Sequence, residues 1–237
     1  MQKSSVLRFI LPLVALSIPQ LLSSPPDRCQ SVRAAAIPKI AAFQARRAAI
    51  PVQVLVQSPA ETTTELQIIC LFQSAPENTP HGSLVEINQK LQGLLEQIRT
   101  PALFRGDLGE TLLITPSTGT LAAKNLLLIG LGDSETFTPQ RMEVVGTIAY
   151  GESKRLNIRH PYFAPTILDG GVARYKTGEI SQAFMTGFLR AVRTERILVG
   201  VGASTIEVVQ DLTFLAGAAH AKDTKQGIEA ALATNGR

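Results

Sequence analysis

Two Gly-rich turns follow apolar runs in this sequence, and backbone N–H groups in such turns can bind an anion. A helix that begins directly afterwards adds unpaired N–H groups and the positive end of its dipole. The chemistry to expect is the binding of a phosphate or a similar group. The candidate residues are Gly130, Gly132 and Asp133 in the first turn and Gly200, Gly202 and Ser204 in the second.

Neither turn completes a nucleotide-binding motif. The dinucleotide fingerprint needs a third glycine three residues after the second, and these positions hold Glu135 and Thr205. Neither stretch contains the Gly-Lys-Ser/Thr of a P-loop. A tight turn by which a buried strand leaves its sheet explains the same glycines. The sequence therefore leaves two interpretations open, an anion site and a structural turn.

The common catalytic and metal-binding patterns are missing from the sequence. His81, His160 and His220 are widely separated and none belongs to a His-Glu-x-x-His motif, so no histidine metal site is indicated. A Gly-x-Ser-x-Gly nucleophile elbow is also missing. We therefore predict no catalytic residue, no metal and no cofactor from these patterns.

The first 36 residues are interpreted as a signal peptide or leader and not as part of the fold. Lys3 and Arg8 accompany an apolar stretch from Phe9 to Leu22. Two prolines interrupt this stretch, and it is shorter than the roughly 20 apolar residues of a membrane helix. The triplet Ala34-Ala35-Ala36 offers a cleavage site, so we expect a periplasmic or secreted protein. The alternative is that this segment stays uncleaved as an N-terminal arm. In that case the arm would be the part of the protein that contacts a membrane.

Charge and cysteine content argue against two classes of protein. Removing the first 36 residues takes away four basic residues and one acidic residue, so the formal net charge falls from +4 to +1. The basic pI of the whole chain therefore does not indicate nucleic-acid binding. The same cleavage removes Cys29 and leaves Cys70 alone in an apolar run, which excludes a disulfide framework.

Apolar runs and helical spacing alternate along the rest of the chain. We expect residues 37–50 to form a linker and residues 51–237 to form one α/β domain, with helices on both faces of a mixed sheet. Pro161 places the strand at 157–165 near an edge of that sheet. The predicted strands are 51–57, 65–72, 110–116, 125–132, 157–165 and 196–202. The predicted helices are 83–98, 139–155, 177–191, 204–219 and 222–237, with capping boxes at Ser83/Glu86 and Ser204/Glu207.

Two stretches have a familiar order of features, "LFRGDLGETLLITPSTGTLAAKNLLLIGLGDSETFTPQRMEVVGTIA" and "GEISQAFMTGFLRAVR". They resemble the N-terminal domain of the leucyl aminopeptidase family. In the first, a phenylalanine precedes a Gly-rich turn, an acidic residue starts a strand, and a lysine or arginine precedes an apolar strand that ends in Gly-Leu-Gly. The similarity covers about Val52 to Arg196. It implies a three-layer, macro-domain-like fold with a mixed, mostly parallel sheet, which in that family supports oligomer assembly.

The peptidase of that family lies in a separate domain with two metal ions. Nothing here resembles its Asn-Thr-Asp-Ala-Glu-Gly-Arg or Lys-Gly-Ile-Thr-Phe-Asp segments. The resemblance therefore implies a non-catalytic module that binds a partner protein, a second copy of itself or a small ligand. The helix face around Gly187 and the strand edges are the expected contact surfaces.

Macro domains bind ADP-ribose over Gly-rich loops, which implies a second interpretation. Gly170 and Gly171 in "LDGGVA" resemble the Gly-Gly-Val of such a loop, although no asparagine pair precedes them and they fall late in the chain. Binding or hydrolysis of an ADP-ribose-like nucleotide requires that the loops at 130–133, 169–172 and 200–204 converge at one end of the sheet. A third interpretation is an accessory subunit of a separate metal-dependent aminopeptidase.

Overall fold

The computed structural model describes residues 50–74, 80–101, 103–205 and 208–235 of the chain. The predicted leader lies outside these ranges, as does the predicted linker apart from Ile50. The expectations about export and cleavage therefore concern residues on which the structure bears no information.

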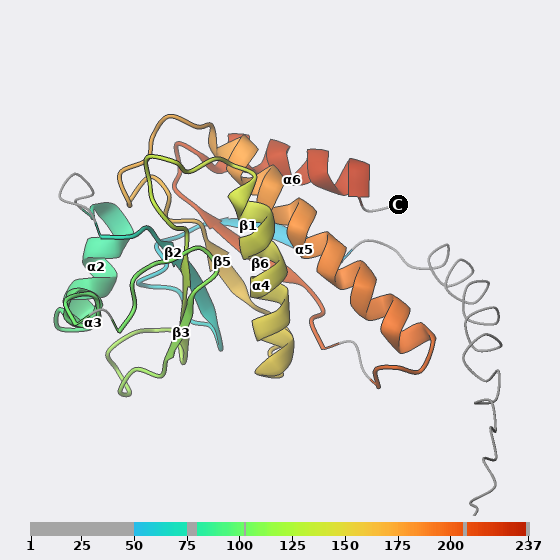
Figure 1. Ribbon diagram of the computed structural model, residues 1–237, viewed down its shortest axis with the longest axis horizontal. Helices are drawn as coiled ribbons and strands as arrows, with labels where there is room; N and C mark the ends of the chain where they lie inside the picture. The colour runs from blue at the N-terminus through green and yellow to red at the C-terminus, as the bar shows by residue number, and fades with distance from the viewer. Residues whose placement is uncertain (1–49, 75–79, 102, 206–207, 236–237) are drawn as a thin grey trace, which may run out of the picture.

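A six-stranded sheet forms the centre of the described part of the chain (Figure 1). Its strand order is β1-β6-β5-β2-β4-β3, and all neighbouring strands are parallel except β3 and β4. The predicted mixed, mostly parallel sheet is confirmed. The strands are β1 (Val52–Val56), β2 (Gln67–Leu71), β3 (Thr111–Ile114), β4 (Leu126–Gly130), β5 (Tyr162–Ala164) and β6 (Leu212–Ala216).

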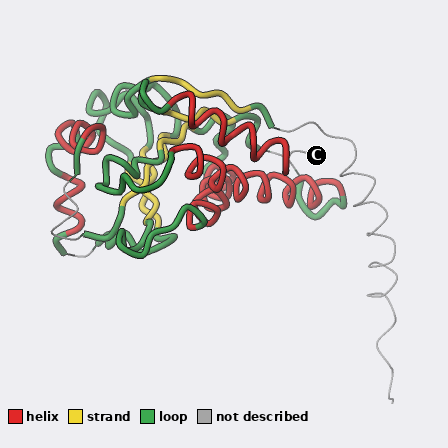
Figure 2. Tube along the Cα trace, turned by 90° about the horizontal axis from the view of Figure 1, so that it is seen from above, coloured by secondary structure: helices red, strands yellow, loops and turns green. Residues whose placement is uncertain are grey.

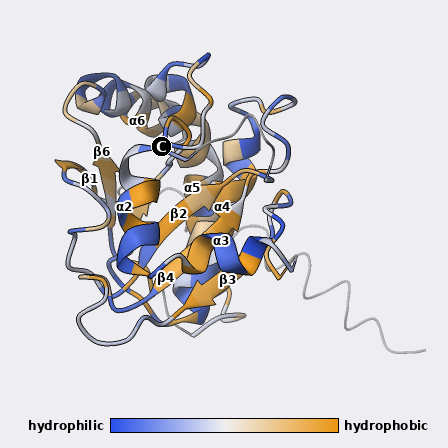
Figure 3. Ribbon diagram, turned by 90° about the vertical axis from the view of Figure 1, so that its left-hand side faces the viewer, coloured by the Kyte–Doolittle hydropathy of each residue, from blue (hydrophilic) through white to orange (hydrophobic). Residues whose placement is uncertain are grey.

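Helices cover both faces of the sheet, so the fold has three layers (Figure 2). Successive side chains of a strand point to opposite faces, and those of β6 enter two separate cores: Phe214 packs in one and Leu215 in the other. The strands β2 and β4, which are buried along their whole length, are hydrophobic in the colouring of Figure 3. One face carries α2 (Gly82–Lys90) and α3 (Leu94–Arg99), and the other carries α4 (Arg141–Arg155), α5 (Thr177–Gly200) and α6 (Ala221–Asn235).

The strand around Pro161 lies in the middle of the sheet, so its predicted edge position is wrong. β5 begins one residue after Pro161 and pairs with β2 on one side and β6 on the other. Pro161 still takes part in the pairing, because its carbonyl accepts a hydrogen bond from the Thr213 N–H at 3.1 Å. A proline directly before a strand removes no N–H from the ladder. This position explains why a central strand tolerates it.

The run "RILVGVG" is not the last strand. It continues α5, whose helical hydrogen bonds extend to the Val201 N–H. The last strand is "LTFLA" at β6, within a region predicted as helix. Ser204 does not cap a helix, since its hydroxyl donates to Glu195 at 2.6 Å. Short apolar runs fit helix and strand equally well, which is the reason for both errors.

The first predicted helix is two helices. The break falls at Gln92 and Gly93, which have φ values of 55° and 82°. Ser83 and Glu86 form no capping box, because Ser83 is bonded to Asp169 and Glu86 to Ser58. The remaining helices occur where expected, with α4 beginning two residues after Pro139, α5 beginning at Thr177 and α6 beginning at Ala221.

The backbones of α4 and α5 touch where two glycines cross. A Cβ on Gly187 would overlap the Glu143 carbonyl, and a Cβ on Gly146 would overlap the Phe184 carbonyl. Both glycines are buried in this contact. The face around Gly187 is therefore an internal packing surface, and its interpretation as a contact surface for a partner is wrong.

Replacing Gly187 by alanine is expected to destabilise the fold strongly. The added methyl would meet a main-chain carbonyl, which cannot change rotamer, so we expect a loss near the upper end of the roughly 1–3 kcal/mol typical of overpacking. Urea denaturation of the two proteins measures it. Gly151→Ala on α4 is the matched control, because nothing lies within 4 Å of its Cβ position. That change should raise stability by up to about 1 kcal/mol; equal effects at both glycines would contradict the packing.

Candidate functional site

A cavity of about 570 Å³ opens at the carboxyl ends of β1, β5 and β6. In parallel α/β sheets this edge is where ligands bind, and the volume is in the range of small-molecule sites. We call it the strand-end cavity. Its lining comprises residues 56–59, 164–169 and 215–218 together with Ser83, Glu86, Val172, Tyr175, Thr177, Ile180, His220 and Thr224.

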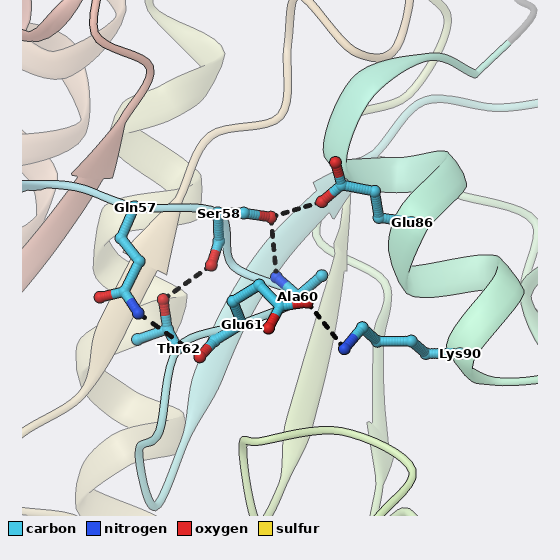
Figure 4. A network of polar contacts seen from close by, with 7 residues as sticks. All are labelled: Gln57, Ser58, Ala60, Glu61, Thr62, Glu86 and Lys90. Carbon is cyan, nitrogen blue, oxygen red and sulfur yellow. Dashed lines mark hydrogen bonds and ion pairs between the residues drawn. The ribbon is translucent and has the colours of Figure 1, made fainter.

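One wall of the cavity is the connection that leaves β1, and polar contacts attach it to α2 (Figure 4). The Ser58 hydroxyl donates to Glu86 at 2.6 Å and accepts the Ala60 N–H at 3.3 Å. The Thr62 hydroxyl donates to the Ser58 carbonyl at 2.8 Å. Farther along α2, the Lys90 Nζ forms an ion pair with the Glu61 Oε1 at 2.8 Å. These contacts hold the mouth of the cavity in one arrangement.

Thr166, at the base of the cavity, has an unusual backbone conformation. Its φ of 52° is in the left-handed region, which β-branched residues rarely adopt. The Thr166 hydroxyl accepts the Cys70 N–H at 3.0 Å and donates to the Cys70 carbonyl at 2.6 Å. After β5 ends, the Thr166 hydroxyl thus bonds the N–H and the carbonyl of Cys70 in β2, where a backbone group of a neighbouring strand would otherwise bond. These two bonds hold the β5–α5 loop against the sheet, and the left-handed backbone at Thr166 is locally strained.

Three helices begin beside the cavity, and carboxylates cap two of them. Asp169 accepts from the N–H of Ser83 at 3.1 Å and also from its hydroxyl, at the start of α2. Asp223 accepts from the Gly178 N–H at 2.7 Å and from the Thr177 hydroxyl at 2.9 Å, at the start of α5. The backbone bond from Gly178, followed by the Thr177 bond, lowers the pKa of Asp223. The third helix, α6, carries Asp223 in its own first turn.

Among the described residues of the lining there is no cysteine. Cys70, whose backbone is bonded to Thr166 of the lining, is fully buried, and this burial raises the pKa of its thiol far above the ordinary value, which disfavours the reactive thiolate. The Ser58 and Ser83 hydroxyls donate to carboxylates and not to an imidazole. Within the described residues, no group of three or more His, Cys, Asp or Glu side chains could hold a metal ion.

The first predicted Gly-rich turn uses its N–H groups in the fold. The amides of Gly130, Leu131 and Gly132 donate to the carbonyls of other segments at 2.8, 2.9 and 2.8 Å. A Cβ on Gly130 would overlap the Asp107 carbonyl, which explains the glycine. The Asp133 carboxylate accepts the Glu135 N–H at 3.0 Å within its own turn. This geometry is that of a structural turn outside the strand-end cavity.

The loop around Gly170 and Gly171 borders the cavity, and neither glycine lines it. Their N–H groups donate to the carbonyls of Thr166 and Leu168 at 3.0 and 2.9 Å. A Cβ on Gly170 would lie 2.9 Å from the Phe72 ring. The neighbouring Asp169 and Val172 do line the cavity.

The second predicted Gly-rich turn lies at the other end of α5. This helix starts beside the cavity and ends at Gly200, and Gly202 and Ser204 follow it, so none of the three residues lines the cavity. The three predicted loops therefore do not converge on one pocket. A ligand role for the individual residues of these loops stays a prediction.

The sequence reasoning missed the cavity's own polar residues. Ser58, Ser83 and Glu86 come from the β1 exit and the start of α2, and His220 and Thr224 come from the β6 exit. The first group was detectable, because residues directly after a parallel strand lie at the ligand-binding edge. The second was hidden, because β6 was assigned to a helix.

Comparison with known proteins supports the fold. A model of the cytosol aminopeptidase family, N-terminal domain, matches residues 68–192, just over half of the chain. A tomato leucine aminopeptidase variant is 18% identical with a TM-score of 0.55, over 77% of this chain but only 35% of its own. An Oceanobacillus iheyensis macrodomain with ADP is 12% identical with a TM-score of 0.53, over 77% of this chain and 92% of its own.

A Trypanosoma brucei macrodomain in complex with ADP is 13% identical with a TM-score of 0.52, over 75% of this chain and 69% of its own. At such identities these structures establish the macro-domain-like fold alone. No curated protein matches the sequence. In the described part of the chain, no helix has the length and apolar character needed to cross a membrane.

Replacing Asp223 by alanine should destabilise the fold by about 1 kcal/mol at neutral pH, since it removes a helix cap. The pKa of Asp223 in the folded protein lies below its ordinary value of 3.8. The stabilisation that the ionised Asp223 gives to the fold is therefore fully present above pH 3.8 and is lost as the pH falls through the folded pKa. The difference from the unmodified protein should therefore shrink in acid. Thermal unfolding between pH 7 and pH 2 measures it. Glu229→Ala, an exposed change on the same helix, is the control; a pH-independent difference for Asp223→Ala would contradict the cap.

Proposed function

We propose that this chain, which belongs to the cytosol aminopeptidase family through its N-terminal domain, is a non-catalytic module that binds a small ligand in the strand-end cavity. The single observation that carries the proposal is the cavity itself. It has about 570 Å³ of space at the edge of the sheet where parallel α/β folds bind ligands.

The composition of the lining also supports ligand binding. Apolar side chains such as Ile167, Ile180 and Leu215 form much of the surface, and polar groups such as Ser83 and His220 lie among them. Small-molecule sites combine an apolar surface with a few polar groups that set the orientation of the ligand. Because the wall at Ser58 is attached to α2, the cavity requires little rearrangement to accept a ligand.

The proposal of a non-catalytic role rests on the groups beside the cavity. The Cys70 thiol is fully buried, and both serine hydroxyls are bonded to carboxylates. The tomato enzyme is matched over only 35% of its length. Its peptidase activity is therefore not transferred to this chain. Assembly with further copies or a separate aminopeptidase, and export, remain proposals from the sequence.

A nucleotide is the second candidate ligand. Two macrodomains with the same fold were solved with ADP. The cavity is large enough for a nucleoside, and three helices begin beside it. We rank this candidate second because Glu86 and Asp169 are carboxylates and no lysine or arginine occurs among the described residues of the lining.

Ala218→Trp tests the proposal directly. Ala218 is exposed in the loop after β6 and lines the cavity, whereas the neighbouring Ala219 is exposed and does not line it. Saturation-transfer NMR with phenethylamine, 2-phenylethanol and ADP as probes should detect saturable binding of at least one of them. Ala218→Trp should abolish this binding, since the indole fills the entrance, and Ala219→Trp should leave it unchanged. Binding by no probe, or equal binding by both variants, would contradict the proposed function.

A further inference from the structure

The charged side chains that line the strand-end cavity are acidic. Glu86 and Asp169 contribute carboxylates, and no lysine or arginine occurs among the described residues of the lining. A phosphate group in this cavity would therefore have no cationic side chain of the lining as a partner.

The helix starts do not reverse this balance. Each helix N-terminus is equivalent to roughly half a positive elementary charge. Asp169 already occupies the start of α2, and Asp223 occupies that of α5 and lies in the first turn of α6. With Glu86 added, three carboxylates lie at or beside these three helix starts, and Lys176 and His220 are the oppositely charged groups that act on Asp223. The two carboxylates of the lining itself, Glu86 and Asp169, have no lysine or arginine of the described lining as a partner.

Two of the carboxylates are close together and retain oxygen atoms for a ligand. Ser83 and Glu86 are three residues apart on α2 and share a face of that helix, and Ser83 holds Asp169. Within the described residues, both bonds to Asp169 end on Oδ2, and the bond to Glu86 ends on Oε2. Within the same residues, no hydrogen bond ends on Asp169 Oδ1 or Glu86 Oε1, and Asp169 Oδ1 lies beside Gly82, 2.7 Å from the position of a Cβ there.

Part of the lining is apolar. Ile167, Ile180 and Leu215 are each at most 4% exposed and contribute to the lining. A ligand that fills the cavity therefore places an apolar body against these residues and directs its polar group to the carboxylates of Glu86 on α2 and Asp169 in the β5–α5 loop. Burial of that body favours binding, and the acidic mouth selects the polar group.

We infer that the strand-end cavity selects a small molecule in which an apolar body carries a protonated amine, and that it discriminates against phosphate-bearing ligands. This inference rests on the proposed function of the cavity as a ligand site. The ammonium donates to the carboxylates of Glu86 and Asp169, and the apolar body packs on Ile167, Ile180 and Leu215. No bond is made or broken.

Calorimetric titration of the full chain with matched probes tests the inference. Phenethylamine and 2-phenylethanol have the same apolar body and differ in the terminal group, an ammonium or a hydroxyl. We expect phenethylamine to bind at least about fivefold more tightly, which is the scale of one partly exposed charge pair. Salt should reduce the difference because exposed charges are screened. ADP should bind more weakly than phenethylamine.

Glu86→Gln identifies the group responsible. Glutamine can still accept the bond from Ser58, so the wall is retained while the charge is lost. The affinity for phenethylamine should fall about fivefold, and that for 2-phenylethanol should not change. Glu65→Gln is the matched control: Glu65 is exposed, lies 3.7 Å from Lys124 and does not line the cavity. This control changes the net charge equally and should leave both affinities unchanged.

The outcomes separate this inference from the proposed function. Equal affinities for the amine and the alcohol, or no effect of Glu86→Gln, would overturn the inference. Tighter binding of ADP, abolished by Ala218→Trp, would overturn it too but leave the proposed function intact. The absence of binding by all three probes would contradict both.

Discussion

Parallel strand pairing is the constraint on which the rest of this structure depends. Each parallel neighbour requires the chain to return from the carboxyl edge of the sheet to its amino edge. Consequently α2, α5 and α6 begin at the same edge, where β2, β5 and β6 end. The connection from β1 to β2 also leaves from this edge and is attached to α2 through Ser58 and Glu86. The strand-end cavity lies among these exits.

The same constraint determines the electrostatics of the cavity. Several helix N-termini at one edge concentrate partial positive charge there, and the chain supplies the compensating anions from its own loops. Asp169 reaches α2 from the β5–α5 loop, and Asp223 reaches α5 from α6. These caps tie separate segments of the fold together. They also occupy positions where a phosphate would otherwise bind, which is why we favour an amine-bearing ligand.

The sequence predicted the architecture better than the site. Long apolar runs such as that of β4 and strongly periodic helices such as α5 identify their own type of element, and the family resemblance supplied the three layers. Predictions from local sequence patterns were wrong where tertiary contacts determine the type of an element or its place in the sheet. Pro161 can precede a central strand because the sheet needs only its carbonyl, which accepts the Thr213 N–H. The end of α5 was predicted as a strand and is helical, and β6 was predicted as part of a helix and is a strand. The glycines at 130 and 132 carried a pattern shared by turns and phosphate loops, and only the acceptors of their N–H groups distinguish the two. The cavity residues come from four separate exits, so no single motif in the sequence could reveal them.

The most direct measurement of the central claim is a ¹H–¹⁵N NMR titration of the ¹⁵N-labelled chain with phenethylamine. We expect the amide shifts to concentrate at Ser58, Ser83, Thr177 and His220, which line the strand-end cavity from four different segments. Shifts confined to residues 130–133 or 200–204, or spread over the surface without saturation, would contradict it.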